Sequence, residues 1–173
     1  MTFNNYTQKS LEAVQSAQNI AVQHSNQQLE QIHLLLALLQ QDGGLTPQLL
    51  RKMGVNAESL EAAAKAEVRN LPTVTGSREA DRFYISAAVD ATFRTAEQQA
   101  QRMKDDFISV EHLLLALIEA AQGSVKNLFE TYRVTKEGVL QALQGIRGSQ
   151  RVTTDNPEST YDALEKYGTD LVK

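Results

Sequence analysis

Few side chains in this sequence could do acid–base or metal chemistry. His33 and His112 each come directly before a Leu-Leu-Leu-Ala-Leu run, while His24 stands apart from both. Three scattered imidazoles are too few for a metal site, which needs several ligands at characteristic spacing. His33 and His112 could form a symmetric ligand or base pair. The interpretation we favour is that each lies half-buried at a helix N-terminus and bonds to a backbone group.

A second group of titratable residues is acidic. Asp105, Asp106 and Glu111 surround a predicted loop and helix start, with Phe107 between them. A catalytic dyad needs two carboxylates whose environments separate their pKa values, and a solvated loop does not supply such environments. We therefore expect a solvated loop in which Glu111 favours the helix dipole. The alternative is a recognition site, with acids at the edge of an apolar patch.

Familiar catalytic motifs are missing from the sequence. It contains no Gly-x-x-x-x-Gly-Lys-Ser/Thr, no Gly-x-Ser-x-Gly and no His-Glu-x-x-His, so the chain is predicted not to be an enzyme and to hold no metal or cofactor. Of its 173 residues, 42% are hydrophobic and 22% charged, as in globular proteins. The formal net charge of −4 and the lack of a long basic run argue against nucleic-acid binding.

The predicted location is the cytoplasm. The chain has no cysteine, which is consistent with a reducing compartment. No signal-peptide pattern is present, and no apolar run is long enough to cross a bilayer, so no membrane association is expected.

The most informative feature is an internal repeat. The six residues His33–Leu38 recur as His112–Leu117, 79 positions later, and the same offset gives thirteen identities between 17–63 and 96–142 without a gap. A chance match of six letters would not keep its register through so many turns and helix starts. The sequence therefore predicts a duplication, with two halves packed about a pseudo-twofold axis.

Hydrophobic periodicity predicts an all-α fold of two four-helix repeats. Apolar residues recur at helical spacing, and Thr7, Asn56, Ser86 and Ser109 are predicted N-caps. The nearly continuous apolar runs at 34–39 and 113–118 predict a buried central helix in each repeat. The predicted helices cover about residues 7–22, 30–41, 46–54, 56–70, 86–103, 109–123, 124–132 and 135–146.

The predicted domain covers residues 1–147. The first copy comprises about residues 1–71, a polar connector covers 72–85, and the second copy comprises about 86–147. After it, 148–160 reads as a flexible linker because it is polar and contains Pro157, and 161–173 resumes helical spacing.

Several segments together resemble the N-terminal domains of the Clp family of AAA+ unfoldases. These are "NYTQKSLEAVQSAQNIAV" with "IHLLLALL" in the first copy and "DDFISVEHLLLALIE" in the second. Within that family, the ending "ALEKYGTDLV" resembles the segment that joins this domain to the first ATPase module in the disaggregating branch. The resemblance extends over essentially the whole chain.

The resemblance implies a substrate-binding module tethered to an ATPase ring. The whole protein would be a homohexamer that binds unfolded or aggregated polypeptide and cooperates with a DnaK-type chaperone, with ATP and Mg bound by the ATPase modules; the isolated domain would be a monomer. The alternatives are an adaptor- or substrate-binding domain of a proteolytic Clp ATPase and, more remotely, a small helical enzyme. The residues implied in polypeptide binding are Thr7, Ser86, Val89, Phe93, Asp105, Phe107, Glu111 and His112. The first copy has Ile32 where the second copy has the acidic Glu111, so we expect polypeptide to bind the second copy.

Overall fold

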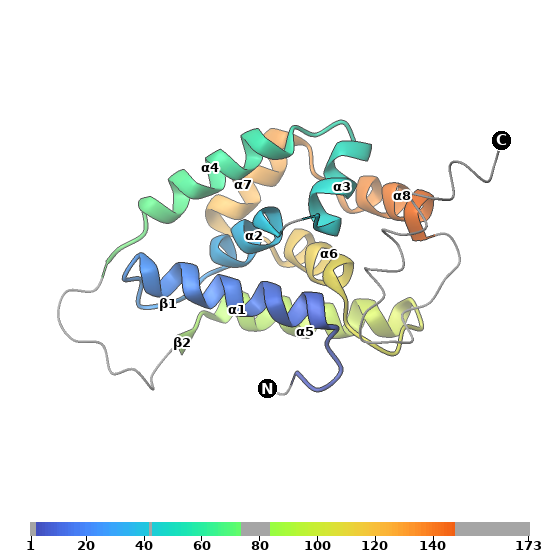
Figure 1. Ribbon diagram of the computed structural model, residues 1–173, viewed down its shortest axis with the longest axis horizontal. Helices are drawn as coiled ribbons and strands as arrows, with labels where there is room; N and C mark the ends of the chain where they lie inside the picture. The colour runs from blue at the N-terminus through green and yellow to red at the C-terminus, as the bar shows by residue number, and fades with distance from the viewer. Residues whose placement is uncertain (1–2, 42, 74–83, 148–173) are drawn as a thin grey trace.

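The computed structural model describes residues 3–41, 43–73 and 84–147 (Figure 1). The regular structure in this part of the chain is helical apart from two short strands, which confirms the predicted all-α class. The helices are α1 (Gln8–Gln23), α2 (Gln31–Gln40), α3 (Leu45–Lys52), α4 (Ala57–Arg69), α5 (Ala87–Arg102), α6 (Val110–Ala120), α7 (Gly123–Tyr132) and α8 (Lys136–Arg147). The strands are β1 (Gln28–Leu29) and β2 (Tyr84–Ile85).

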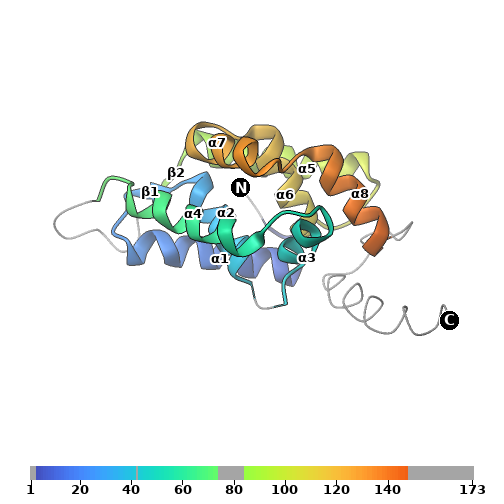
Figure 2. The same cartoon turned by 90° about the horizontal axis from the view of Figure 1, so that it is seen from above.

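The helices form three layers. Figure 1 shows α1 and α5 on one side, α2 and α6 in the middle, and α3, α4, α7 and α8 on the other side. The view from above shows α4 next to α7 and α3 close to α8, and both pairs are in contact (Figure 2). Each of these contacts joins one copy to the other, so the two repeats share one core.

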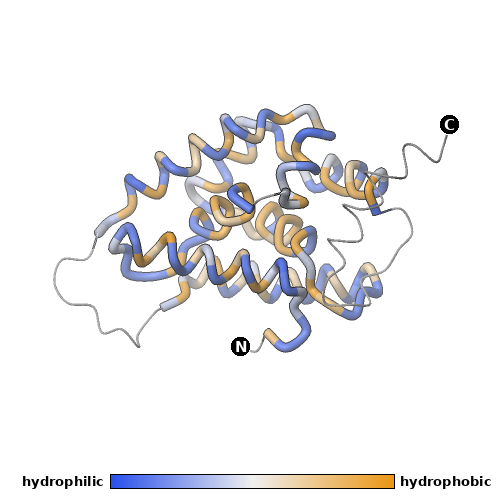
Figure 3. The backbone as a smooth tube through the Cα atoms, in the orientation of Figure 1, coloured by the Kyte–Doolittle hydropathy of each residue, from blue (hydrophilic) through white to orange (hydrophobic). Residues whose placement is uncertain are grey.

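The central helices are where the apolar runs predict them to be. Leu34–Leu38 and Leu113–Leu117 are buried throughout, and the backbone coloured by hydropathy shows apolar segments gathered in the middle of the domain (Figure 3). Small buried side chains on the outer helices allow the central helices to pack closely against them. These are Ala13 and Ala17 on α1, and Ala96 and Ala100 on α5. Burial of the central helices α2 and α6 on nearly every side supplies the main driving force for folding.

Short strand pairings connect the two copies reciprocally. Leu29 of β1 pairs in parallel with Ile85 of β2, and Tyr6 forms a parallel bridge with Ile108. At the 79-residue offset, Leu29 corresponds to Ile108 and Tyr6 to Ile85. In each copy, therefore, the segment before the central helix pairs with the segment before the first helix of the other copy. This reciprocity is what a pseudo-twofold arrangement requires, and the sequence did not predict the strands, which are too short to show alternation.

Some predicted segments are only partly described. The predicted connector at 72–85 includes residues outside the described ranges, and the predicted linker at 148–160 and helical segment at 161–173 lie outside them entirely. Within the described part, no helix is both long and apolar enough to span a membrane.

Arg133 occupies a backbone conformation that favours glycine. It ends α7 with φ 57°, and its counterpart in the first copy is Gly54, with φ 78°. A side chain in the left-handed region is strained, and glycine relieves that strain. We expect Arg133→Gly to raise the free energy of unfolding by about 0.5–1 kcal/mol, measured by urea unfolding. Gly54→Arg is the matched reverse change and should lower it; equal effects of the two variants would contradict the argument.

Candidate functional site

Thr7 and Ser86 begin the first helix of each copy and anchor it to the other copy. The Thr7 hydroxyl accepts a hydrogen bond from the Ser10 N–H at 3.2 Å, and the Ser86 hydroxyl accepts one from the Val89 N–H at 3.1 Å. The backbone N–H of Thr7 donates to the Ile108 carbonyl at 2.9 Å, and that of Ser86 donates to the Leu29 carbonyl at 3.0 Å. Both residues are buried. Each is an N-cap whose backbone N–H also takes part in the strand pairing between the two copies.

Phe93 and Val89 belong to the core. Both are 0% exposed, and the Phe93 ring packs edge-to-face against Phe3 and Tyr6 with centroids 5.5 and 6.4 Å apart. The Tyr6 hydroxyl has no hydrogen-bond partner among the described residues, and burial, with a smaller effect from the charge of Glu97, raises its pKa well above its ordinary value. These rings join the N-terminal segment to α5 and leave Phe93 unavailable to a ligand in this conformation.

Asp105, Glu111, His112 and Arg147 form a buried ionic cluster at the start of α6. The Arg147 guanidinium contacts an Asp105 oxygen, and its Nη1 lies 3.5 Å from Glu111 Oε2. The Asp105 and Glu111 side chains are 0% exposed and that of Arg147 is 4% exposed. Ser109 also hydrogen-bonds to the Glu111 carboxylate. Two buried carboxylates are tolerated here because one guanidinium lies between them.

The hydrogen bonds of His112 define its tautomer. Its Nδ1 accepts from the Ser109 backbone N–H at 2.9 Å, so Nε2 carries the proton and donates to Asp105 Oδ2 at 2.7 Å. His33 repeats this arrangement: its Nδ1 accepts from the Glu30 N–H at 2.9 Å, and its Nε2 lies 2.8 Å from the Asn26 carbonyl oxygen. The predicted backbone bond is confirmed for both residues. The predicted half-burial is wrong, because both rings are 0% exposed.

The ionic cluster occurs in the second copy alone among the described residues. At the same offset, the first copy has Asn26 for Asp105, Ile32 for Glu111 and Val68 for Arg147, while histidine is retained. Ile32 and Val68 are buried, as are the charged residues that replace them. An apolar pair and a charged pair thus occupy equivalent places. Arg147 was missed by the sequence analysis, although extending the repeat register to Val68 would have identified it.

The predicted solvated loop around the acids is therefore wrong. Asp106 is exposed, but Asp105 and Glu111 turn inward to Arg147, and Phe107 is half-buried. The predicted apolar groove around Ser86, Val89, Phe93 and His112 is not an open surface either, because these four side chains are buried. The structure places Thr7 at the start of α1 and Ser86 and Val89 at the start of α5, with Phe93 farther along α5. Asp105, Phe107, Glu111 and His112 lie at or just before the start of α6.

The exposed apolar side chains lie elsewhere. The large hydrophobic residues most exposed in the described part are Leu11, Val22, Tyr84, Ile85 and Leu140. Val22 and Tyr84 are more than half exposed, at 54% and 52%. Val22 is in the last turns of α1, which leads into β1, and Tyr84 and Ile85 form β2, the partner of β1 (Figure 1). These three residues, named the apolar end below, are exposed on elements at the β1–β2 end of the domain and are candidates for contact with an extended chain.

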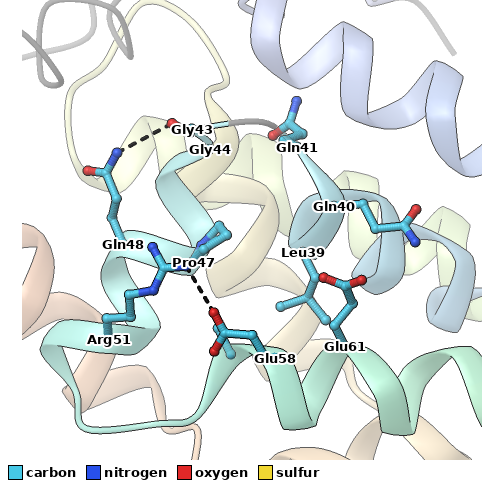
Figure 4. Close-up of a pocket in the computed structure, with 11 residues that line it drawn as sticks. Leu39, Gln40, Gln41, Gly43, Gly44, Pro47, Gln48, Arg51, Glu58 and Glu61 are labelled. Atoms are coloured by element: carbon cyan, nitrogen blue, oxygen red, sulfur yellow. Dashed lines mark hydrogen bonds and ion pairs between the residues drawn. The ribbon is translucent and has the colours of Figure 1, made fainter.

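Two equivalent pockets are found at the ends of the central helices. The first, of about 620 Å³, lies between α2, α3 and α4, and the ion pair from Arg51 Nη2 to Glu58 Oε1, 3.2 Å long, borders it (Figure 4). Hydrogen bonding at its own backbone and the neighbouring Arg51 hold the pKa of Glu58 below its ordinary value. The second pocket, of about 700 Å³, lies between α6, α7 and α8. Glu130, which lines it, is the counterpart of Arg51 in the repeat.

Charged side chains line both pockets, among them Arg51 and Glu58 in the first and Lys126 and Glu130 in the second. The described residues contain no group of three or more His, Cys, Asp or Glu side chains placed to hold a metal ion. The arrangement as a whole is a duplicated helical domain with a buried ionic cluster and an exposed apolar end, which is suited to binding. The family model described as "Clp repeat (R) N-terminal domain" matches residues 5–160, and the chain belongs to this family.

Its curated relatives are ClpB chaperones. The chain is 44% identical over 173 residues to the chaperone protein ClpB of Bacillus cereus, covering 99% of this chain and 20% of that protein. It is 38% identical over 175 residues to ClpB of Nitratidesulfovibrio vulgaris, covering 100% of this chain and 20% of that protein. The chain thus spans about a fifth of the length of these relatives.

Solved structures share the fold. The Hsp104 N-terminal domain from Candida albicans superposes with a TM-score of 0.77 at 22% identity, covering 90% of this chain and 99% of that one. The N-terminal domain of the ClpV1 ATPase from E. coli gives a TM-score of 0.70 at 19% identity, covering 90% and 92%. At these identities the likeness concerns the fold.

Proposed function

We propose that this chain is the client-binding module of a ClpB-type disaggregating chaperone. It binds unfolded or aggregated polypeptide and helps to deliver it to an ATPase ring. The observation that carries the proposal is the apolar end of a domain whose family members are chaperone N-domains: Val22, Tyr84 and Ile85 are exposed although a folded monomer gains nothing from exposing them.

The apolar end suits an extended chain of little sequence preference. β2 presents two apolar side chains on a backbone that is already extended, so a client can align beside it and bury its own apolar residues. Binding by a small exposed patch is weak and reversible, as delivery to a ring requires. The buried residues Thr7 and Ser86 then act indirectly, by holding α1, β2 and α5 in position, and Glu111 does so by joining the start of α6 to Arg147 of α8.

The proposal extends to the protein of which this chain is a part. ATPase modules outside this chain bind ATP and Mg and form a cytoplasmic homohexamer that cooperates with a DnaK-type chaperone, while the isolated domain is a monomer without catalytic activity. The alternative of an adaptor-binding domain in a proteolytic Clp ATPase has less support, because the ClpB similarity continues over 99% of the chain.

A surface variant tests the client-binding proposal. We expect Tyr84→Ser combined with Ile85→Ser to raise the Kd for a permanently unfolded protein, such as reduced carboxymethylated α-lactalbumin, by about tenfold, because apolar anchors carry most of the binding free energy. The free energy of unfolding should change by less than about 0.5 kcal/mol. Fluorescence anisotropy measures the binding.

The matched control is Leu140→Ser, which removes an exposed apolar side chain on α8, away from the apolar end. It should leave the Kd unchanged. An unchanged Kd in the double variant, or an equal loss in the control, would contradict the proposal.

A further inference from the structure

Arg147 is buried although it is the last residue of α8. Its side chain is 4% exposed, and its guanidinium contacts the carboxylates of Asp105 and Glu111, whose side chains are 0% exposed. The last turn of a helix usually frays, and a charged side chain there usually lies in water. The ionic cluster therefore holds the last turn of α8 against the start of α6.

An uncharged relay in the first copy holds the end of α4 in a related way. His33 Nε2 donates to Asn26 Oδ1 at 2.8 Å, and Asn26 Nδ2 donates at 3.2 Å to the carbonyl oxygen of Pro72, just beyond α4. Asn26 is the counterpart of Asp105, and His33 is the counterpart of His112. In both copies, the same histidine and its partner thus hold the segment through which the chain leaves the copy.

The two exits lie at opposite ends of the domain. Pro72 lies near β1, because the following Thr73 forms an antiparallel bridge with Asn26. Figure 1 shows the last turn of α8 at the other end, away from β1 and β2. The apolar end belongs to α1 and β2, so it lies away from the point at which the chain leaves the second copy.

The two sides of the cluster differ in how easily they reach water. Glu111 is in the first turn of α6, a central helix, so its carboxylate reaches water only if that helix moves. Arg147 ends α8, so its guanidinium reaches water when a single turn opens. A buried guanidinium without its carboxylates is costly. Loss of the acids is therefore relieved by local opening at the end of α8.

We propose that the ionic cluster positions the exit of the chain from the domain. Asp105 and Glu111 hold Arg147 and so keep the last turn of α8 opposite the apolar end. The client-binding surface is then presented away from the segment that leads out of the domain. In this arrangement the two acids are positioning residues and do not contact the client. The inference rests on the proposed function for what is presented, while the hold on α8 is independent of it.

The test combines Asp105→Asn with Glu111→Gln in the 1–173 chain and follows trypsin cleavage after Arg147 by mass spectrometry. Trypsin binds the guanidinium of the residue before the cleaved bond, so burial of that group protects the bond. Cleavage after Arg147 should be at least about tenfold faster in the double variant, with the wild-type rate after Arg69 and Arg94. Glu111→Gln alone keeps the Asp105 contact and should accelerate cleavage about threefold.

Two further variants serve as control and rescue. Asp106→Asn removes an exposed acid next to Asp105 and should leave every cleavage rate unchanged. The triple variant Asp105→Asn, Glu111→Ile, Arg147→Val introduces the uncharged set of the first copy. Amide hydrogen exchange at Ile146 should be about tenfold faster in the double variant and should return to the wild-type rate in the triple variant.

Client affinity separates positioning from contact. The double variant should bind reduced carboxymethylated α-lactalbumin with a Kd within about twofold of the wild-type value, because the apolar end is unchanged. A raised Kd with wild-type cleavage after Arg147 would overturn the inference and make the acids client contacts. Equal acceleration of cleavage at all three arginines would also overturn it, because it would indicate a general loss of stability. An unchanged Kd in the β2 double variant would count against the proposed function alone.

Discussion

Replacing Arg147 by valine is expected to lower the free energy of unfolding by about 3–5 kcal/mol. The change removes the guanidinium that lies between Asp105 and Glu111, and two carboxylates with 0% side-chain exposure lose the cation that both contact. Burial of an unpaired charge is one of the few ways in which a single substitution has so large an effect. Urea unfolding followed by circular dichroism measures the change.

The first copy supplies the control for this prediction. A triple variant with Asp105→Asn, Glu111→Ile and Arg147→Val gives the second copy the residues found at Asn26, Ile32 and Val68. Because an uncharged set is already buried at the equivalent place, the free energy of unfolding of the triple variant should lie within about 1 kcal/mol of the wild-type value. A triple variant as unstable as Arg147→Val alone would show that the two copies are not interchangeable at this position.

Acidification is expected to destabilise the domain through His33. Burial, with a smaller effect from the charge of His24, lowers the pKa of His33 from 6.5 to about 4. The unfolded chain therefore takes up the proton before the folded domain does, so the stabilisation is complete above pH 6.5 and is lost as the pH falls towards 4. The lost free energy amounts to about 2 kcal/mol at pH 5 and about 3 kcal/mol near pH 4.

His33→Gln isolates this contribution, because glutamine can still donate to Asn26 but does not titrate in this range. Unfolding free energies of both proteins are measured at about pH 7 and about pH 5. The loss on acidification should be roughly 2 kcal/mol smaller in the variant than in the wild type. Equal losses in the two proteins would mean that protonation of His33 does not oppose folding.

Much of the fold could be predicted because the sequence repeats it. The apolar runs ending at Leu38 and Leu117 identify the central helices, and the constant offset orders the other helices around them. Capping residues such as Asn56 and Ser86 mark helix starts by local chemistry, and the structure confirms both. The β1–β2 pairing could not be predicted, because two-residue strands depend on contacts between segments far apart in the chain.

The environment of the candidate site could not be predicted from local sequence. Asp105 stands between Lys104 and Asp106 along the chain, which suggests a solvated loop. The cation that contacts Asp105 and Glu111 is Arg147, at the end of α8. Phe93 has the spacing of either a core or a groove residue, and only packing against Phe3 and Tyr6 distinguishes the two. Long-range partners decide burial, and periodicity does not identify them.

In the proposed function, clients bind the exposed apolar end, while the buried residues only support it. The most direct measurement is an NMR titration of the 1–173 chain with reduced carboxymethylated α-lactalbumin, following backbone amide signals. We expect the largest shifts at Val22, Tyr84 and Ile85, with small shifts at Phe93 and Glu111. The largest shifts at Phe93 and Glu111, with none at β2, would contradict it and would show that the domain opens to receive its client.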